Sequence, residues 1–492
     1  MKLKDIIQNI KILSSNADLE TEIGSVCYDS RQVKPGDLFV AVKGFASDGH
    51  RFIPMAVEKG AAAVLCEDVP GTGVPYVQTD DCRLGLALTS RDFYGNPAAE
   101  MTMIGFTGTN GKTTSSYLMK HLLEDRLGAK VGLIGTNGNW IGEEYLPSEH
   151  TTPESCDLHA LFRRMADAGC THVVMEVSSH SLALQRVAGI RFDVAVFTNL
   201  TQDHLDFHGS MEEYAAAKRI LFDQCETGCF NLDDPWSDFM RSSATCRQLT
   251  YSAETDEAEL TAKDVRLYAD HIRFAAVRGR EIAMTRLAIP GMFSVHNALG
   301  VMSVGVALGL SLADCAQTMA TAKGVKGRVE VVPTDGDYAV LIDYAHTPDA
   351  LENVLRTLKP VTKGRLIVLF GCGGDRDKGK RPQMGHIAAA NADLCIVTSD
   401  NPRTEEPEEI IREILEGMQN SRTPVQVICD REEAIAWAID NARSGDVILL
   451  AGKGHEDYQV VGHVKRHMDE REIVAACLGR RRAQRAALQD SQ

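Results

Sequence analysis

The chain has 492 residues, a length that predicts about three domains at roughly 100 to 200 residues each. With 44% hydrophobic and 24% charged residues, its composition is that of a globular protein and excludes the disordered, collagen-like and coiled-coil classes. The net charge of −16 argues against a broad surface for nucleic acid or anionic membranes. We therefore expect no nucleic-acid partner, and any anionic ligand must be held locally.

The 13 cysteines include no Cys-x-x-Cys pair, and the closest two, Cys225 and Cys229, are expected near a turn without a matching His or Cys cluster. This pattern argues against a zinc site and against a secreted disulfide framework. The N-terminus lacks the apolar core of a signal peptide, and no apolar run approaches the ~18 residues of a membrane span. We expect a cytoplasmic protein with reduced thiols and no membrane insertion.

The N-terminal part is predicted to form a small α/β unit. Short apolar strands are expected within residues 37–44, 61–68 and 74–81, with a helical stretch at 53–60. A Gly-Asn-Pro sequence at 95–97 interrupts any continuing helix and marks a linker. We place the first domain at residues 1–97.

A different pattern follows the linker. Nearly continuous apolar strands within 101–108, 129–136, 172–179 and 193–200 alternate with helix-compatible stretches, which indicates a parallel sheet covered on both faces. After residues 324–332 the pattern restarts as a third, separately wound α/β unit. The fold class is thus α/β in three domains, with a central phosphate-loop sheet at 98–327 and a Rossmann-like domain at 328–492.

The sharpest local signal is GTNGKTT at residues 108–114, between an apolar strand and a predicted helix. Glycines let backbone N–H groups face phosphate oxygens, Lys112 can reach the outer phosphates, and Thr113 can bind Mg²⁺. The usual spacing would place a glycine at Phe106, where this chain has none. The alternative is a glycine-rich strand-to-helix turn that binds no nucleotide.

Two other strands of the central sheet end in polar residues. Glu176 and Ser178 follow one strand, and His204 follows another. Ligands of open parallel sheets bind beyond the carboxyl ends of the strands, so these residues should converge on the phosphate loop, where Glu176 and His204 could face a metal. Taken singly, each could instead be a helix cap or an ordinary loop residue. Lys218 is, on composition alone, an ordinary helix lysine.

Three polar loops follow strands of the third domain. GCGGDRDKGKRP at 371–382 is predicted to be a basic loop that meets an anionic ligand, because its proline and aspartates do not fit a dinucleotide fingerprint. The second loop offers Asp400 and Arg403, and the third offers Gly452 and Glu456. The alternative for the second loop is an Asn-Pro turn with a capping box at 404–406.

Together, several segments resemble the Mur ligase family of ATP-dependent amino-acid ligases, which build the stem peptide of peptidoglycan. They are GTNGKTT, HTTPES from His150, EVSSH from Glu176, TNLTQDHLDFHG from Thr198, YAAAK from Tyr214, PGMFSVHNALG from Pro290, GVKGRVE from Gly324 and DYAHTPDAL from Asp343. Within the family, residues 28–44 and the three C-terminal loops are similar to members that add meso-diaminopimelate to UDP-N-acetylmuramoyl-L-alanyl-D-glutamate. DNPR at 400–403 points to meso-diaminopimelate in particular.

The resemblance implies a set of ligands and site residues. ATP would bind Gly108, Thr109, Asn110, Gly111, Lys112, Thr113, Thr114, Asn297, Arg328 and Asp343. The UDP-substrate would bind Ser30, Thr151, Thr152, Ser178 and Arg186. The diaminopimelate would bind Arg376, Asp400, Asn401, Pro402, Arg403, Gly452 and Glu456. Mg²⁺ would bind Thr113, Glu176, His204 and Lys218, with Lys218 carbamylated; Lys112, Lys218 and His204 are the predicted catalytic residues.

The implied activity is amide formation through an acyl phosphate by a monomeric enzyme of peptidoglycan precursor synthesis. Two related activities remain as alternatives, a folylpolyglutamate synthase and a lysine-adding ligase; the N-terminal domain disfavours the first and DNPR disfavours the second. A third alternative, from another class, is a catalytically idle nucleotide-binding scaffold.

Overall fold

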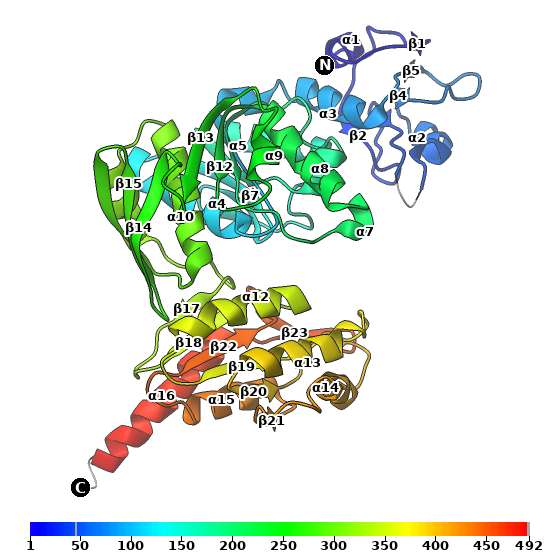
Figure 1. Cartoon of the computed structure of the whole chain (residues 1–492). Helices are drawn as coiled ribbons and strands as arrows, with labels where there is room; N and C mark the ends of the chain where they lie inside the picture. Colours follow the sequence, from blue (N-terminus) through cyan, green and yellow to red (C-terminus); the bar gives the residue numbers. More distant parts are fainter. Residues whose placement is uncertain (45–46, 490–492) are drawn as a thin grey trace. The chain divides into compact units, whose positions relative to one another are not determined.

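The computed structural model describes residues 1–44 and 47–489 (Figure 1). Contacts divide the chain into two compact units. The first comprises Met1–Thr261, Arg278–Glu281 and His296–Thr318, and the second comprises Ala262–Val277, Ile282–Val295 and Met319–Gln492. The predicted domain boundaries after residues 97 and 327 do not follow this division and stay a prediction.

The N-terminal sheet has the strand order β1-β5-β4-β3-β2. Strands β2 to β5 are parallel, and β1 pairs antiparallel with β5. Side chains from alternate strand positions form two separate clusters: Leu38 and Leu65 pack with helices α1 and α3, whereas Phe39 and Val64 pack with α2. The elements are α1 (Leu3–Ile6), β1 (Ser14–Ser15), β2 (Val26–Cys27), β3 (Leu38–Val40), η1 (Gly49–Phe52), α2 (Ile53–Glu58), β4 (Ala63–Cys66), β5 (Tyr76–Gln78), α3 (Cys82–Phe93) and η2 (Pro97–Glu100).

The central sheet of the first unit follows the order β13-β12-β11-β6-β10-β7-β8-β9. Its six strands from β13 to β7 are parallel, as predicted, and the hairpin β8-β9 continues it antiparallel. The elements are β6 (Thr102–Thr107), α4 (Lys112–Leu127), β7 (Val131–Gly135), β8 (Gly138–Ile141), β9 (Glu144–Leu146), α5 (Ser155–Asp167), β10 (His172–Glu176), α6 (Ser179–Ala183), β11 (Phe192–Phe197), α7 (Leu205–His208), α8 (Met211–Asp223), β12 (Cys225–Asn231), α9 (Ser237–Arg241) and β13 (Arg247–Ser252).

Helices α5, α8 and α9 cover one face of this sheet, where Met103, Met175 and Phe197 pack against Phe162 of α5 and Phe222 of α8. Helix α4 contacts β6, β7 and β10. Cys225 begins β12 directly after the turn that ends α8, as expected, and Cys229 lies further along the same strand.

Five further elements lead to the C-terminal part, and the sequence pattern does not predict them individually. They are β14 (Leu260–Leu267), β15 (Ile272–Arg278), β16 (Glu281–Leu287), α10 (Met292–Ala307) and α11 (Leu312–Thr321).

The C-terminal sheet has the order β17-β18-β22-β19-β20-β21, parallel except for β17. Its elements are β17 (Glu330–Val332), β18 (Ala339–Asp343), α12 (Pro348–Leu358), η3 (Lys359–Val361), β19 (Leu366–Phe370), α13 (Lys380–Asn391), β20 (Leu394–Val397), α14 (Pro407–Glu416), β21 (Val425–Val427), α15 (Arg431–Asp440), β22 (Val447–Ala451), the hairpin β23 (Tyr458–Val461) with β24 (Val464–His467), and α16 (Glu470–Gln489).

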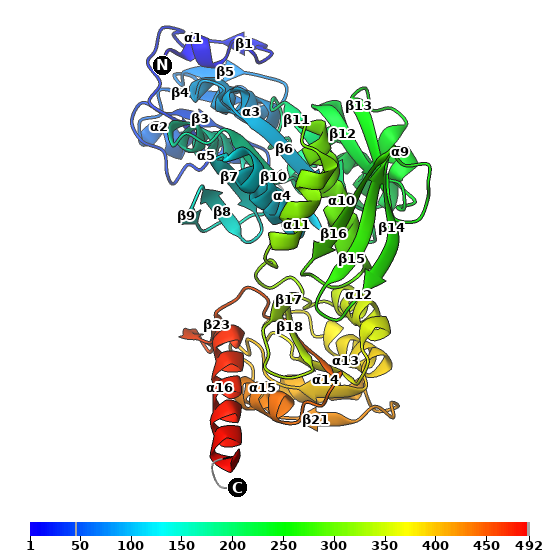
Figure 2. The same cartoon turned by 90° about the vertical axis from the view of Figure 1, so that its left-hand side faces the viewer.

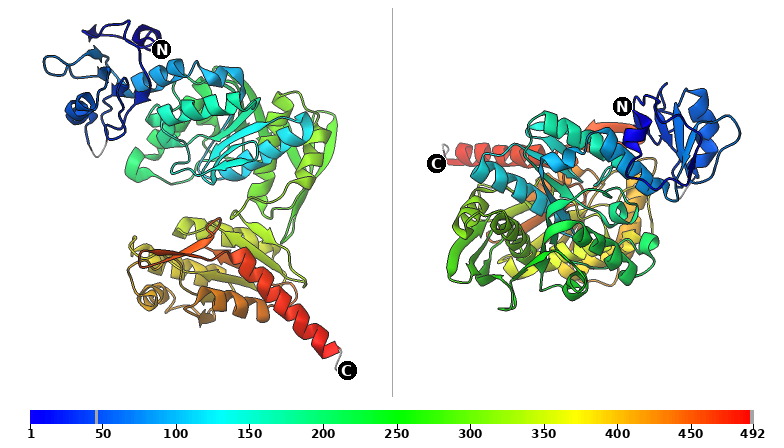
Figure 3. Two further views of the ribbon diagram at one scale, coloured as in Figure 1. Left: turned by 180° about the vertical axis from the view of Figure 1, so that it is seen from behind. Right: turned by 90° about the horizontal axis from the view of Figure 1, so that it is seen from above.

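This sheet is covered on both faces, as the restarting pattern predicts. Val368 and Phe370 pack with α12, α13 and α14, whereas Ile367 and Leu369 pack with α15 and α16. Figure 2 shows α15 and α16 on the side of the sheet opposite α12, and Figure 3 shows the red α16 running on past its sheet. Among the described helices, none combines the length and the apolar composition needed to cross a membrane.

Candidate active site

The segment GTNGKTT forms the turn between β6 and α4, as the sequence predicts. Two of its glycines have left-handed backbone angles, with φ of +150° at Gly108 and +87° at Gly111. A Cβ at Gly108 would lie 1.9 Å from Thr198 Oγ1, and a Cβ at Gly111 would lie 2.4 Å from Asn297 Oδ1. Both positions therefore require glycine, because a side chain would meet neighbours that hold the loop.

The end of β11 fixes the same loop from the side. Thr198 Oγ1 donates to the carbonyl of Asn110 at 2.7 Å, and the Asn199 side chain accepts from the Asn110 N–H at 2.9 Å. The Thr109 N–H donates to the Asn199 carbonyl at 2.9 Å. These bonds hold the loop in place before a nucleotide binds.

Two lysines converge on one carbonyl oxygen of the loop. Lys112 Nζ donates to the carbonyl of Gly108 at 2.8 Å, and Lys218 Nζ, from α8, donates to the same oxygen at 2.9 Å. Lys218 is 1% exposed, and burial, with the positive charge of Lys112 second, holds its pKa well below the ordinary value. The arrangement places two lysine side chains where a phosphate would sit, and Lys112 supplies positive charge there.

Thr113 and Glu176 meet at the ends of α4 and β10. Thr113 Oγ1 donates to Glu176 Oε2 at 3.0 Å, and Thr136 donates its N–H to Oε1 at 2.9 Å. Glu176 is 1% exposed. Hydroxyl and carboxylate oxygens are the ligands that Mg²⁺ prefers, so this pair fits a hard cation.

His204 lies in a group of aromatic rings. Its own φ is +53°, and its ring packs edge-on against His180 with centroids 4.8 Å apart. It also lies 6.2 Å from the Tyr214 ring, over which Lys218 Nζ sits at 4.5 Å. Tyr214 thus links two of the predicted catalytic residues, while the metal role of His204 stays a prediction.

The residues predicted to hold the muramoyl-dipeptide form one hydrogen-bonded network beside Glu176. Thr151 Oγ1 bonds Thr136 Oγ1 at 3.0 Å, and Thr152 Oγ1 donates to the Glu176 carbonyl at 2.8 Å. The Ser178 N–H donates to Thr152 Oγ1 at 3.2 Å, and Arg186 donates to the Thr152 carbonyl at 3.0 Å. Four predicted residues are therefore brought together.

Ser30, the fifth predicted contact of this substrate, is buried in the segment after β2. Two hydrogen bonds tie that segment to α5: the Tyr28 hydroxyl donates to Asp157 at 2.7 Å, and the Cys156 thiol donates to the Val26 carbonyl at 3.1 Å. The N-terminal sheet is thereby attached to the helix that follows residues 151–152.

The remaining predicted nucleotide contacts differ in character. The Asn297 Nδ2 is buried without a hydrogen-bond partner among the described residues, which suits a ligand acceptor. Arg328 packs its guanidinium 5.3 Å from the Tyr344 ring centroid. Asp343, by contrast, already accepts the N–H groups of Val329 and Ala345 at 2.8 Å each, and burial raises its pKa. This aspartate shapes the loop around it.

In the second unit, the second and third C-terminal loops meet around a lysine that the sequence analysis does not single out. Lys453 is 0% exposed, and its Nζ donates to Asn401 Oδ1 at 2.6 Å. It lies 3.3 Å from Glu456 Oε2 and 3.6 Å from Asp400 Oδ1. Asn401 also donates to Glu456 Oε2 at 2.9 Å. A charged residue between two glycines after a buried strand is the signal that could have found it.

The close approach of these loops also explains Gly452. Its φ is +110°, and a Cβ there would lie 2.7 Å from Asp400 Oδ2. Pro402 packs its carbonyl against the first loop, 1.9 Å from where a Cβ of Gly374 would be. Arg403, with φ of +52°, donates to the Gly374 carbonyl at 2.8 Å.

Part of the positive charge of the loop at 371–382 is already paired within the protein, and its binding of an anionic ligand stays a prediction. Arg381 is 0% exposed and paired with Glu405 at 2.9 Å and Glu413 at 2.6 Å, and Lys378 also pairs with Glu405. These cations neutralise carboxylates of the protein. Arg376 is exposed and donates to the backbone carbonyl of Asp375, so its guanidinium remains available to an anion.

The capping-box alternative for the second loop is wrong in its detail. Helix α14 begins after Glu406, whose side chain makes no capping hydrogen bond. Thr404 instead bonds Asp375 of the first loop at 2.7 Å. The polar residues after DNPR therefore join loops together.

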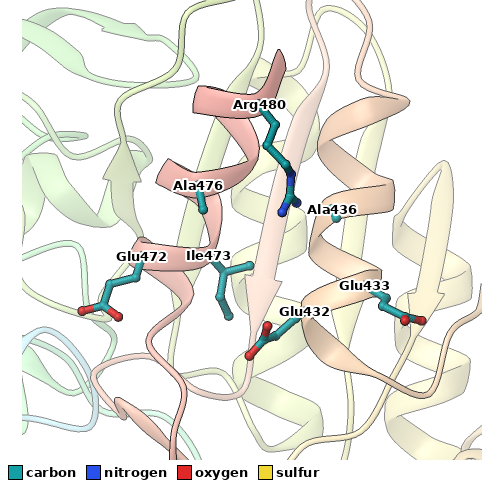
Figure 4. A pocket seen from close by; sticks show the side chains of 7 residues that line it. All are labelled: Glu432, Glu433, Ala436, Glu472, Ile473, Ala476 and Arg480. Carbon is teal, nitrogen blue, oxygen red and sulfur yellow. The ribbon is translucent and has the colours of Figure 1, made fainter. Parts of the chain in front are cut away.

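Two surface hollows elsewhere contain none of the predicted site residues. One, of about 400 Å³, lies between α15 and α16, with Glu432 and Glu472 on its rim and Arg480 above Ala436 (Figure 4). Another, of about 610 Å³, lies beside α2 in the N-terminal sheet region.

The strand-to-helix phosphate loop, with its paired lysines and its threonine-glutamate contact, defines an α/β nucleotide-dependent enzyme. Family models agree: residues 22–82 match the Mur ligase family catalytic domain, residues 106–305 the Mur ligase middle domain, and residues 327–454 the Mur ligase glutamate ligase domain. The chain belongs to the Mur ligase family, whose members are ATP-dependent ligases.

Individual relatives are similar along nearly their whole length. The chain is 47% identical to a UDP-N-acetylmuramoyl-L-alanyl-D-glutamate–2,6-diaminopimelate ligase of Caldanaerobacter subterraneus subsp. tengcongensis, over 97% of this chain and 99% of that protein. It is 44% identical to the ligase of the same name from Clostridioides difficile, over 98% and 100%. A solved structure of a ligase with this name superposes with a TM-score of 0.75 at 32% identity, covering 98% of this chain and 99% of that one.

Proposed function

We propose that this chain joins meso-diaminopimelate to the γ-carboxyl of D-glutamate in UDP-N-acetylmuramoyl-L-alanyl-D-glutamate, with conversion of ATP to ADP and phosphate. The relatives that match it from end to end bear the name of this activity. The observation in the chain itself that carries the proposal is the convergence of Lys112 and Lys218 on the phosphate loop.

The chemistry follows from the weakness of a carboxylate as an electrophile. The γ-carboxylate attacks the γ-phosphorus of ATP, ADP leaves, and an acyl phosphate forms. The amine of the amino acid then attacks the acyl carbon and phosphate leaves, giving the amide. Lys112 offsets charge on the transferring phosphoryl group, and the loop N–H groups orient it.

Mg²⁺ would be held by Thr113 and Glu176, with His204 and Lys218 as further contacts, and would supply charge neutralisation at the phosphates. Lys218 suits conversion to a carbamate, because a buried ammonium that donates to a neutral carbonyl is costly and a neutral amine is the form that reacts with CO₂. The carbamate would replace a repelling cation with an anionic ligand.

For the UDP-substrate, we assign the network of Thr151, Thr152, Ser178 and Arg186 to the muramoyl-dipeptide and Ser30 to the uridine-diphosphate part. The network adjoins Glu176 through Thr152, so a dipeptide bound there would lie beside the metal residues. This position suits transfer of a phosphoryl group to its terminal carboxylate.

For the amino acid, we assign the distal carboxylate of diaminopimelate to Arg403 with Arg376, and an ammonium to Asp400 and Glu456. A planar guanidinium grips a carboxylate through two hydrogen bonds, and lysine lacks that carboxylate. The Arg403 guanidinium approaches the loop that carries Arg376. Its Nη1 lies 2.9 Å from the position that a Cβ of Gly373 would take.

The test is amino-acid-dependent phosphate release from ATP, with the UDP-muramoyl-dipeptide and a panel of amino acids. Diaminopimelate should stimulate release most, and omission of either the amino acid or the UDP-substrate should abolish it. Preference for lysine would reassign the substrate, and release with no amino-acid dependence would favour the idle scaffold.

A further inference from the structure

A buried lysine at the centre of the amino-acid loops has no assigned role. Lys453 follows β22 and is 0% exposed, although a fully buried lysine is rare unless paired. Its ammonium makes three short hydrogen bonds or ion contacts: Asn401 Oδ1 at 2.6 Å, the Tyr458 carbonyl at 2.7 Å and Glu456 Oε2 at 3.3 Å. Such a group is fixed in position on several sides.

Two carboxylates share this ammonium. Asp400 Oδ1 lies 3.6 Å from Lys453 Nζ, and Glu456 Oε2 is the second carboxylate oxygen beside it. The next buried charge, Arg431, is cancelled by Glu470 at 2.8 Å, both 0% exposed. The cluster of Asp400, Lys453 and Glu456 therefore carries a net charge of one negative unit, apart from the guanidiniums of Arg403 and Arg376 on the neighbouring loops.

That net charge matters for the choice of substrate. Diaminopimelate has two ammonium and two carboxylate groups and is neutral overall, whereas lysine carries one net positive charge. A site with two uncompensated carboxylates would favour lysine on charge alone. One ammonium inserted between them reduces that advantage.

We propose that Lys453 is a positioning and specificity-determining residue, which holds Asn401 and Glu456 in place and sets the charge of the Asp400, Lys453 and Glu456 cluster against cationic amino acids. This inference rests on the proposed function. Lys453 acts through Asp400 and Glu456 and is not itself a substrate contact.

Replacing Lys453 with Met removes its charge at similar length, and replacing it with Gln removes the charge but keeps an N–H donor for Asn401. In both variants the ratio of kcat/KM for diaminopimelate to that for lysine should fall by about tenfold or more, because a unit charge within a few ångströms changes relative affinity on that scale. The KM for ATP should stay unchanged.

Two further variants sharpen the test. Glu456→Gln should shift the ratio the opposite way, and Lys453→Met combined with Glu456→Gln should restore it toward the wild-type value, although absolute rates fall. The matched control is Lys465→Met. Lys453 Nζ and Lys465 Nζ lie 5.6 Å and 3.4 Å from the centroid of the Tyr458 ring, but Lys465 belongs to the exposed strand β24. This control should leave the ratio unchanged.

The outcomes separate this inference from the function on which it rests. If wild-type enzyme does not use diaminopimelate, the proposed function is wrong, whatever Lys453 does. If the wild-type enzyme does use diaminopimelate, an unchanged ratio in Lys453→Gln, with both amino acids slowed equally, would mean that Lys453 stabilises the loops and does not determine selectivity. Should both Lys453 variants fail to fold, an unchanged ratio in Glu456→Gln would overturn the charge argument by itself.

Discussion

Lys218 in the first unit and Lys453 in the second are both buried, and their surroundings are opposites. Lys218 donates to a neutral carbonyl, with a second cation, Lys112, on the same oxygen. Lys453 is surrounded by a carboxamide and two carboxylates. Burial lowers the pKa of both; for Lys453 the carboxylates of Asp400 and Glu456 oppose this effect, whereas for Lys218 the positive charge of Lys112 adds to it.

Burial of a lysine therefore has different chemical consequences at the two positions. An ammonium without a counter-charge is poised to lose its proton and react, which suits a lysine that becomes an anionic metal ligand. An ammonium with two counter-charges stays paired with them and fixes the groups around it. Substitution of the lysines at the phosphate loop should therefore mainly lower the reaction rate. Substitution in the amino-acid loops should mainly change the selectivity between amino acids.

The largest effect is expected at the phosphate loop. Lys112→Ala should lower the rate of ATP-dependent ligation roughly 10³-fold or more, because the charge on the transferring phosphoryl group loses its partner. Calorimetry should show UDP-substrate binding largely intact. The control is Lys120→Ala on the same helix, whose lysine pairs with Glu124 at 2.5 Å; ligation retained in Lys112→Ala would exclude this loop as the phosphate site.

Lys218→Ala should be nearly inactive and should recover part of its activity when a small carboxylate such as acetate is added. The added anion would occupy the place of the carbamate beside the metal. Acetate should not stimulate wild-type enzyme, and Lys218→Gln, which fills the space, should resist rescue. Full activity in the alanine variant would rule out a metal-organising role.

In the amino-acid loops, Arg403→Ala should mainly change selectivity. The ratio of kcat/KM for diaminopimelate to that for lysine should fall on the order of 10²-fold, since the distal carboxylate loses its guanidinium. Arg412→Ala, at an exposed arginine of α14 paired with Glu409 and Glu416, is the control. A loss of thermal stability with an unchanged ratio would mean that DNPR is a structural turn.

The last prediction concerns stability in acid and not catalysis. Burial lowers the pKa of His159 in α5 to about 3, and both of its ring nitrogens lack partners among the described residues. Because the folded-state pKa lies below the unfolded value of about 6.5, the neutral form stabilises the fold above that pH. As the pH falls from about 6.5 to about 3, protonation of this group in the unfolded state should lower the free energy of unfolding by about 1.4 kcal/mol per pH unit.

His159→Leu should remove this part of the pH dependence, because leucine binds no proton in either state. The measurement is the melting temperature of both proteins between about pH 7 and about pH 4.5, within the window that the two pKa values define. Parallel curves would show that His159 does not stay neutral on folding.

The phosphate loop is predictable from the sequence because its residues are contiguous and their order encodes a strand, a tight turn and a helix. The parallel sheets are equally predictable, since their buried strands are nearly continuous apolar runs. Polar and mixed strands such as β13 to β16 are not, because their burial is one-sided or partial and gives no such run.

The amino-acid loops are harder to predict, because their arrangement depends on pairings distant in sequence. The sequence predicts Arg381 to be one of the cations available to a ligand, yet Glu405 and Glu413 pair with it. Lys453 stands out little in the sequence, yet it lies between Asn401 and Glu456. Glu405 lies 24 positions from Arg381 and Asn401 lies 52 positions from Lys453 along the chain, so the local sequence does not reveal these two pairings.

The central claim is that the enzyme activates the γ-carboxylate of D-glutamate as an acyl phosphate. The most direct test uses UDP-muramoyl-dipeptide in which both oxygens of that carboxylate are ¹⁸O, with ATP and diaminopimelate, followed by mass spectrometry of the released phosphate. One labelled oxygen should appear in the phosphate and the other should remain in the new amide. Unlabelled phosphate released during amide formation would contradict the acyl-phosphate mechanism.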